Sequence, residues 1–165
     1  MDKIEFKKLI AAIDKEISAY EELKILFEEK KELLKKAKSG DLVEVDNRII
    51  AQNELIVKLN KARQKMSLEK FNKDCSMSDY IEIIGEENDD FKEQLMLRKV
   101  KICNILDDLV LLNNQNMELL KHGITITNKM LDTIVDAFAP QGSNYNGAGK
   151  TDTHDLDMWT VNEEI

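Results

Sequence analysis

The chain has 165 residues, of which 34% are charged, 42% hydrophobic and 5% aromatic, with one proline and six glycines. This composition favours long, surface-rich helices over a sheet protein, and the length suits one domain. The net charge of -8 argues against a general nucleic-acid binder, because phosphate recognition needs a basic surface. The charged N-terminus and the lack of a long apolar run predict a cytoplasmic protein without stable membrane insertion.

A stripe of large apolar residues predicts a first helix from about Lys3 to Ala37. The larger groups recur every seven positions, with others between them, so they lie on one side of a helix. The stripe weakens at Lys24 and Lys31. Its members are Phe6, Ile10, Ile13, Ile17, Tyr20, Phe27 and Leu34.

The segment Ser39-Gly40-Asp41 predicts the first break. Gly40 suits a left-handed position at a helix C-terminus, and Asp41 suits the cap of the next helix. A second helix is predicted from about Leu42 to Lys70, again with an apolar stripe. Because the connector is short, the two helices are expected to be antiparallel neighbours.

A short helix is predicted near residues 78–85, within a segment rich in turn-forming residues. Ser78 is the expected cap, Gly85 the expected end, and Ile81 and Ile84 lie on one side. Such a short amphipathic helix is expected to cover one end of the bundle as a plug.

The longest stripe predicts one helix from Asp89 to Phe138, about 75 Å long at roughly 1.5 Å per residue. A helix of this length with one apolar face needs an antiparallel partner from its own chain, a second chain or a client. Gly123 is expected to bend the helix at most, and Asn116 is expected to fix the register of its packing. The stripe consists of Phe91, Leu95, Arg98, Ile102, Ile105, Leu109, Leu112, Asn116, Leu119, Gly123, Ile126 and Met130.

The segment after Phe138 differs from the helices in composition. It has five acids against Lys150 alone, it contains Pro140 and three of the six glycines, and it is expected to be a flexible tail. We therefore predict a helical domain over 1–138 and an acidic tail over 139–165. Trp159, the only tryptophan, is either an anchor for a partner pocket or a group that folds back onto the bundle.

No catalytic, cofactor or metal site is predicted. The group Asp152, His154, Asp155 and Asp157 matches no zinc or calcium spacing. The sequence Gly147–Thr151 resembles the end of a phosphate-binding loop, but it lacks the first glycine and follows no strand. We therefore expect that the protein is not an enzyme.

The order of these parts resembles the FlgN family of flagellar type III export chaperones. The resemblance covers nearly the whole chain as a helical architecture, which is a generic feature. Two short elements are more specific: the polar run Leu112-Asn113-Asn114-Gln115-Asn116 before the last helical turns, and the tail element Tyr145-Asn146-Gly147-Ala148-Gly149-Lys150. The tail is longer and more acidic than the family pattern, and Trp159 is not part of that pattern.

The resemblance implies a cytoplasmic chaperone that masks the amphipathic terminal helices of hook-associated proteins and delivers them to the export gate. It also implies that the tail element docks at the gate, which assigns that role to Tyr145 and Gly149. By position, the end of the long helix is the expected client surface, because its apolar groups span more than one face. These groups are Met130, Leu131, Ile134, Val135 and Phe138.

A second hypothesis is a structural coiled-coil or scaffold protein that associates with itself. It assigns the seam of Ile102, Leu109 and Asn116 to contacts between copies. The sequence leaves the choice between monomer and dimer open, as well as the identity of the client.

Overall fold

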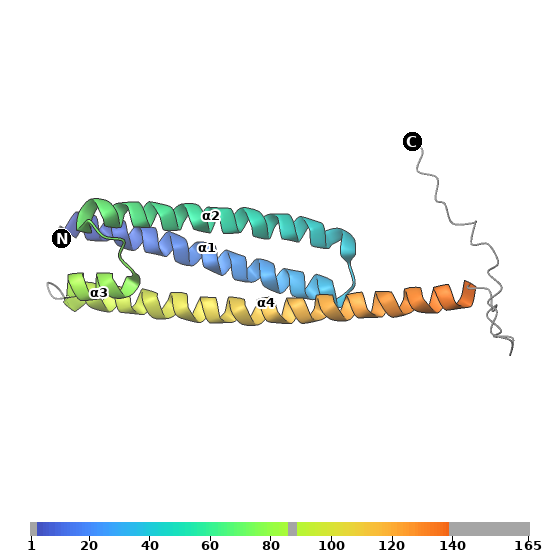
Figure 1. The fold of residues 1–165 in the computed structure, drawn as a ribbon. Helices are drawn as coiled ribbons and strands as arrows, with labels where there is room; N and C mark the ends of the chain where they lie inside the picture. The colour runs from blue at the N-terminus through green and yellow to red at the C-terminus, as the bar shows by residue number, and fades with distance from the viewer. Residues whose placement is uncertain (1–2, 86–88, 139–165) are drawn as a thin grey trace, which may run out of the picture. The chain divides into compact units, whose positions relative to one another are not determined.

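The computed structural model describes residues 3–85 and 89–138, and these residues contain helices and no strand. The helices are α1 (Lys3–Lys35), α2 (Ser39–Phe71), α3 (Met77–Gly85) and α4 (Asp89–Phe138), as Figure 1 shows. The predicted all-α class is confirmed. The chain divides into two compact units, Met1–Ile124 and Thr125–Ile165. The described part of the second unit is the last turns of α4.

Helices α1 and α2 form the predicted antiparallel hairpin. The Arg63 guanidinium late in α2 donates to the Glu16 carboxylate in α1 at 2.8 Å. Nearer the connector, Arg48 of α2 donates to Glu29 of α1 at 2.9 Å. Because later positions in one helix meet earlier positions in the other, the two helices run in opposite directions.

Helix α4 pairs with α1 in the parallel direction. Three side-chain hydrogen bonds join the two helices, and in each the partners are 84 residues apart in sequence. A constant separation means that both helices advance in the same direction. The two lysines that weaken the apolar stripe of α1 therefore serve this contact. The pairs are Asp14–Arg98 at 2.8 Å, Lys24–Asp108 at 2.7 Å and Lys31–Gln115 at 2.6 Å.

The core lies around α1, which buries residues toward both α2 and α4. Ile13 of α1 and Leu95 of α4 are completely buried, and the rings of Phe6 and Phe91 stack with centroids 3.6 Å apart. The buried apolar members from α1 are Phe6, Leu9, Ile13, Ile17, Ala19, Leu23 and Leu26; those from the other helices and the α2–α3 connector include Val45, Ile49, Ile56, Cys75, Tyr80, Leu95, Ile105 and Leu109.

The predicted seam of α4 is buried over its first part only. Leu95, Ile105, Leu109, Leu112 and Asn116 are buried. The next member, Leu119, is partly buried, and Gly123, Ile126 and Met130 are exposed. The helix itself continues through Gly123 as one element, as the in-phase stripe predicted.

The break between α1 and α2 uses other residues than those predicted. Ala37, with φ 52°, is the left-handed residue, while Gly40 lies inside α2, which begins at Ser39. The amide of Lys38 donates to the Leu33 carbonyl and that of Ala37 to the Leu34 carbonyl, each at 3.2 Å. This pair of bonds defines a Schellman motif with Ala37 at its left-handed position. The expected roles of Gly40 and Asp41 were therefore wrong.

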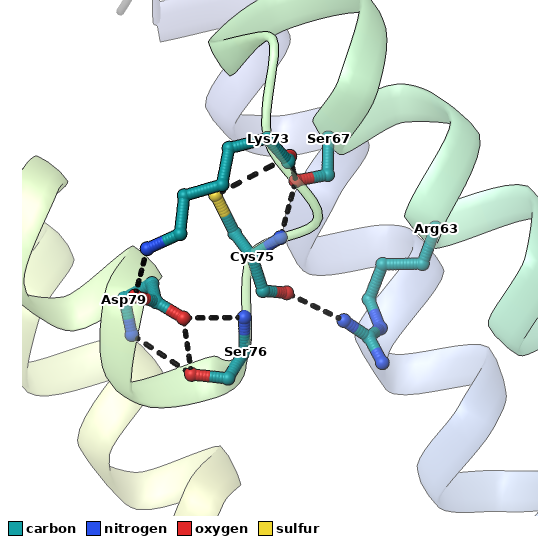
Figure 2. Close-up of polar contacts among 6 residues, drawn as sticks. All are labelled: Arg63, Ser67, Lys73, Cys75, Ser76 and Asp79. Atoms are coloured by element: carbon teal, nitrogen blue, oxygen red, sulfur yellow. Dashed lines mark hydrogen bonds and ion pairs between the residues drawn. The ribbon is translucent and has the colours of Figure 1, made fainter.

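The start of α3 is capped by Ser76 and not by Ser78 (Figure 2). The Asp79 amide donates to Ser76 Oγ at 3.2 Å, and the Asp79 carboxylate accepts from the Ser76 amide at 2.8 Å. This reciprocal arrangement is a capping box with aspartate in place of the usual glutamate. Lys73 also binds the Asp79 carboxylate, at 2.6 Å.

The α2–α3 connector is fixed to the end of α2. Ser67 Oγ accepts from the Cys75 amide at 2.9 Å and donates to the Lys73 carbonyl at 2.7 Å. Arg63 Nη1 donates to the Cys75 carbonyl at 3.4 Å, so one arginine touches both α1 and the connector. These bonds place α3 so that Tyr80 is buried. The ring of Tyr80 lies edge-on to that of Phe71, with the ring centroids 5.9 Å apart. Ile81 of the plug helix packs partly buried against the same core, while the side chain of Ile84 lies outside the described residues.

Candidate functional site

The end of α4 carries exposed apolar side chains at the positions predicted for a client. We call Met130, Leu131, Ile134 and Val135 the terminal patch. Their side chains are 61%, 53%, 50% and 63% exposed. Phe138 ends the helix, but its side chain lies outside the described residues.

The terminal patch is continuous because its members are spaced at helical intervals. Met130 and Ile134, like Leu131 and Val135, are four residues apart and therefore neighbours on one helix face. Polar residues occupy the other side, where Thr133 Oγ1 donates to the Lys129 carbonyl at 2.8 Å. The last turns of α4 are thus an amphipathic helix whose apolar side is wider than a two-helix seam.

Within unit 1, the exposure of α4 changes where α1 ends. At the constant separation of 84 residues, the last residue of α1, Lys35, is level with Leu119. From Leu120 to Val135 every side chain is exposed. Burial of apolar surface stabilises by roughly 25 cal/mol per Å², so clustered exposed apolar groups of this kind are candidates for an interaction site.

A second row of exposed residues on α4 was not predicted from the sequence. We call Leu106, Val110, Asn113, Met117, Leu120 and Ile124 the outer row. Its steps of four and three residues repeat those of the buried seam, one position further around the helix. The spacing was visible in the sequence, but only the contacts with α1 show which of the two rows is buried.

The buried ion pair of unit 1 has a structural role. The side chains of Glu16 and Arg63 are 4% and 15% exposed and lie 2.8 Å apart. Burial raises the pKa of Glu16, and the neighbouring Arg63 guanidinium partly offsets that rise. Because Arg63 also contacts the Cys75 carbonyl, the pair connects α1, α2 and the connector.

A hollow of about 430 Å³ on unit 1 is lined by Leu9, Phe71 and Tyr80 together with charged side chains of both signs. Two of these charged residues, Lys70 and Glu5, form an ion pair at 2.5 Å. Within residues 3–85 and 89–138, no group of three or more His, Cys, Asp or Glu side chains is placed to hold a metal ion. In the same ranges, no helix is long and apolar enough to cross a membrane.

Tyr145, Gly149 and Trp159, the tail positions predicted for gate docking and anchoring, lie outside the described residues. The acidic group around His154, for which no metal site is predicted, does so too. Their roles stay predictions.

Comparison with known proteins shows the family of the chain. A family model described as FlgN protein matches residues 1–153 of the chain. No curated protein and no solved structure shows significant similarity to it.

Proposed function

Since the chain belongs to the FlgN family of flagellar export chaperones, we propose that it binds the amphipathic terminal helices of hook-associated proteins. In this role it prevents their premature assembly in the cytoplasm and delivers them to the type III export gate. The observation that carries the proposal is the terminal patch, an exposed apolar surface on α4.

The terminal patch suits a helical client. A client helix presents apolar residues three and four positions apart, and the patch offers apolar residues at the same intervals. Its width allows it to contact more than one client face or to sit beside a second client helix. Phe138, four residues after Ile134, extends the same apolar side in the sequence.

The tail roles belong to the same proposal. Tyr145 and Gly149 are the proposed contacts with the export gate, because they match the family's tail element. Trp159 is a proposed partner anchor. Residues 1–138 would then form the client-binding domain and residues 139–165 the delivery segment.

The second hypothesis requires Ile102, Leu109 and Asn116 to be accessible to another copy, and they are not. Leu109 and Asn116 are buried within the chain, and Ile102 packs against the same core. That seam is therefore already occupied by α1.

Two truncations test the proposal with purified hook-associated proteins from the same bacterium. A chain ending at Thr127 lacks the terminal patch, while a chain ending at Phe138 lacks only the tail. We expect the shorter chain to lose co-purification of its client and the longer one to retain it. Equal co-purification of the client with both chains would show that the terminal patch is not the client-binding surface.

A further inference from the structure

The outer row of α4 has the width of a seam between two helices. Leu106, Val110, Met117, Leu120 and Ile124 are 39%, 61%, 46%, 38% and 60% exposed. Their alternate spacing of three and four residues is that of a coiled-coil stripe, which is narrower than the apolar face of a helix in a globular core. The occupant that fits such a row is a single α-helix.

The row has a defined beginning. Continued toward the N-terminus, the same spacing reaches Cys103, three residues before Leu106, and then Lys99, four residues before Cys103. Lys99 Nζ donates to Ser78 Oγ of α3 at 2.9 Å, so the plug helix limits the row on this side. The apolar part of the row therefore begins at Leu106.

Charged residues beside the outer row are placed so that an antiparallel second copy brings opposite charges together. Asp107 and Lys121 each directly follow a member of the row, fourteen positions apart, and both are exposed. Asp107 forms no ion pair with any of the described residues. In an antiparallel pair of identical helices, flanking positions of the same kind face each other, so Asp107 of one copy lies beside Lys121 of the other. Two-fold symmetry repeats that contact.

We propose that the outer row is a self-association surface that binds the outer row of a second copy of this chain in the antiparallel direction. In this antiparallel pair, residues of one copy pack against residues of the other in layers: Leu106 against Ile124, Val110 against Leu120, and Asn113 against Met117. A parallel pair would instead place Asp107 beside a position of the buried seam, Ile102 of the other copy, and would leave its charge without a partner. This inference goes beyond the chaperone role and uses residues apart from the terminal patch.

Sedimentation equilibrium of the full chain without client tests the surface. Met117→Glu places a charge in the central layers, and we expect the dimer dissociation constant to rise roughly thirtyfold or more, as for an interface hot spot. Val57→Glu, at a 50% exposed position of α2, is the matched control and leaves dimerisation unchanged. Circular dichroism confirms that both variants remain helical. A wild-type chain that is monomeric at all concentrations overturns the proposal, as does a dimer that Met117→Glu does not weaken.

A charge exchange tests the complementarity. Asp107→Lys and Lys121→Asp each place like charges together across the interface, so each weakens the dimer about threefold to tenfold at low salt. The double variant restores the opposite pairing at the same net charge, and its affinity returns to that of the wild type. Additive weakening in the double variant contradicts the antiparallel contact.

Crosslinking tests the direction. In a Cys103→Ser background, chains carrying Val110→Cys are mixed with chains carrying Leu120→Cys and oxidised. The antiparallel pair places these two positions in one layer, within the reach of a disulfide, so the mixed crosslink dominates. A dominant crosslink between two Val110→Cys chains shows a parallel pair and overturns the stated direction. If the chain is monomeric and Met117→Glu instead abolishes client binding, the outer row belongs to the client.

Discussion

Asn116 on α4 donates a 3.0 Å hydrogen bond from Nδ2 to the carbonyl oxygen of Phe27 on α1. The side chain is 2% exposed, and its Oδ1 has no hydrogen-bond partner among the described residues. A buried acceptor without a partner costs stability, whereas a single polar group in an apolar seam fixes register. This contact therefore places α4 correctly along α1 at some cost in free energy.

Asn116→Leu is expected to raise the free energy of unfolding by about 1 kcal/mol, because it replaces an unsatisfied polar group with an apolar one of similar volume. Urea denaturation measures the change. Asn104→Leu, at an exposed position of the same helix outside the outer row, is the control and changes stability little. A destabilised Asn116→Leu variant would show that the hydrogen bond outweighs the unpaired oxygen.

Removing one partner of the Glu16–Arg63 pair is expected to lower the free energy of unfolding more than removing both. Glu16→Leu alone leaves the Arg63 guanidinium buried without its carboxylate partner and lowers the free energy of unfolding by about 3 kcal/mol. The double variant Glu16→Leu, Arg63→Met removes both charges and regains most of that loss. Chemical denaturation of the single and double variants completes the cycle. Simple additivity of the two single losses would contradict the coupling.

The α1–α2 connector predicts two stabilising substitutions. Ala37 has φ 52°, a conformation that glycine adopts without the steric cost of a side chain, so Ala37→Gly should stabilise by about 1 kcal/mol. Gly40 lies within α2, and a Cβ at that position meets nothing within 4 Å, so Gly40→Ala should stabilise by a similar amount. Thermal unfolding separates this account from the sequence-based one, in which Gly40 is left-handed and Gly40→Ala destabilises.

The capping box of α3 predicts an acid-dependent change. The ion pair with Lys73 and the hydrogen bonds from Ser76 hold the pKa of Asp79 well below its usual range. Because the folded pKa is lower than the unfolded one, this stabilisation is complete above the unfolded value and is lost as the pH falls below about 4. Asp79→Asn should therefore be less stable than the wild type at pH 7, and the gap should narrow toward pH 2. A gap that stays constant over this range would exclude the carboxylate as its source.

Much of the fold could be predicted from apolar periodicity. The α4 seam from Phe91 to Leu119 lies against the core as expected, and the in-phase stripe correctly carried the helix through Gly123. The hairpin of α1 and α2 followed from their short connector. These predictions succeeded because burial of one helix face depends on local spacing, which the sequence contains directly.

The helix ends and the pairing of α4 needed the structure. Either Gly40 or Ala37 was able to end α1, and the choice depends on which carbonyls the turn satisfies. Lys24 and Lys31 weaken the stripe when α1 is considered alone, yet they bind Asp108 and Gln115 of the parallel α4. Only that pairing shows which apolar residues of α4 within unit 1 lie against α1 and which stay exposed.

We propose that the terminal patch holds a helix of a hook-associated protein. Isothermal titration of the purified client into the chain carrying Ile134→Glu and Phe138→Glu tests it most directly. Val43→Glu with Val57→Glu, two exposed positions of α2, provides a control with the same change in charge. The account predicts that the first pair of substitutions weakens binding by about a hundredfold or more, while the control pair leaves it unchanged. Equal affinity for both variants would contradict the account.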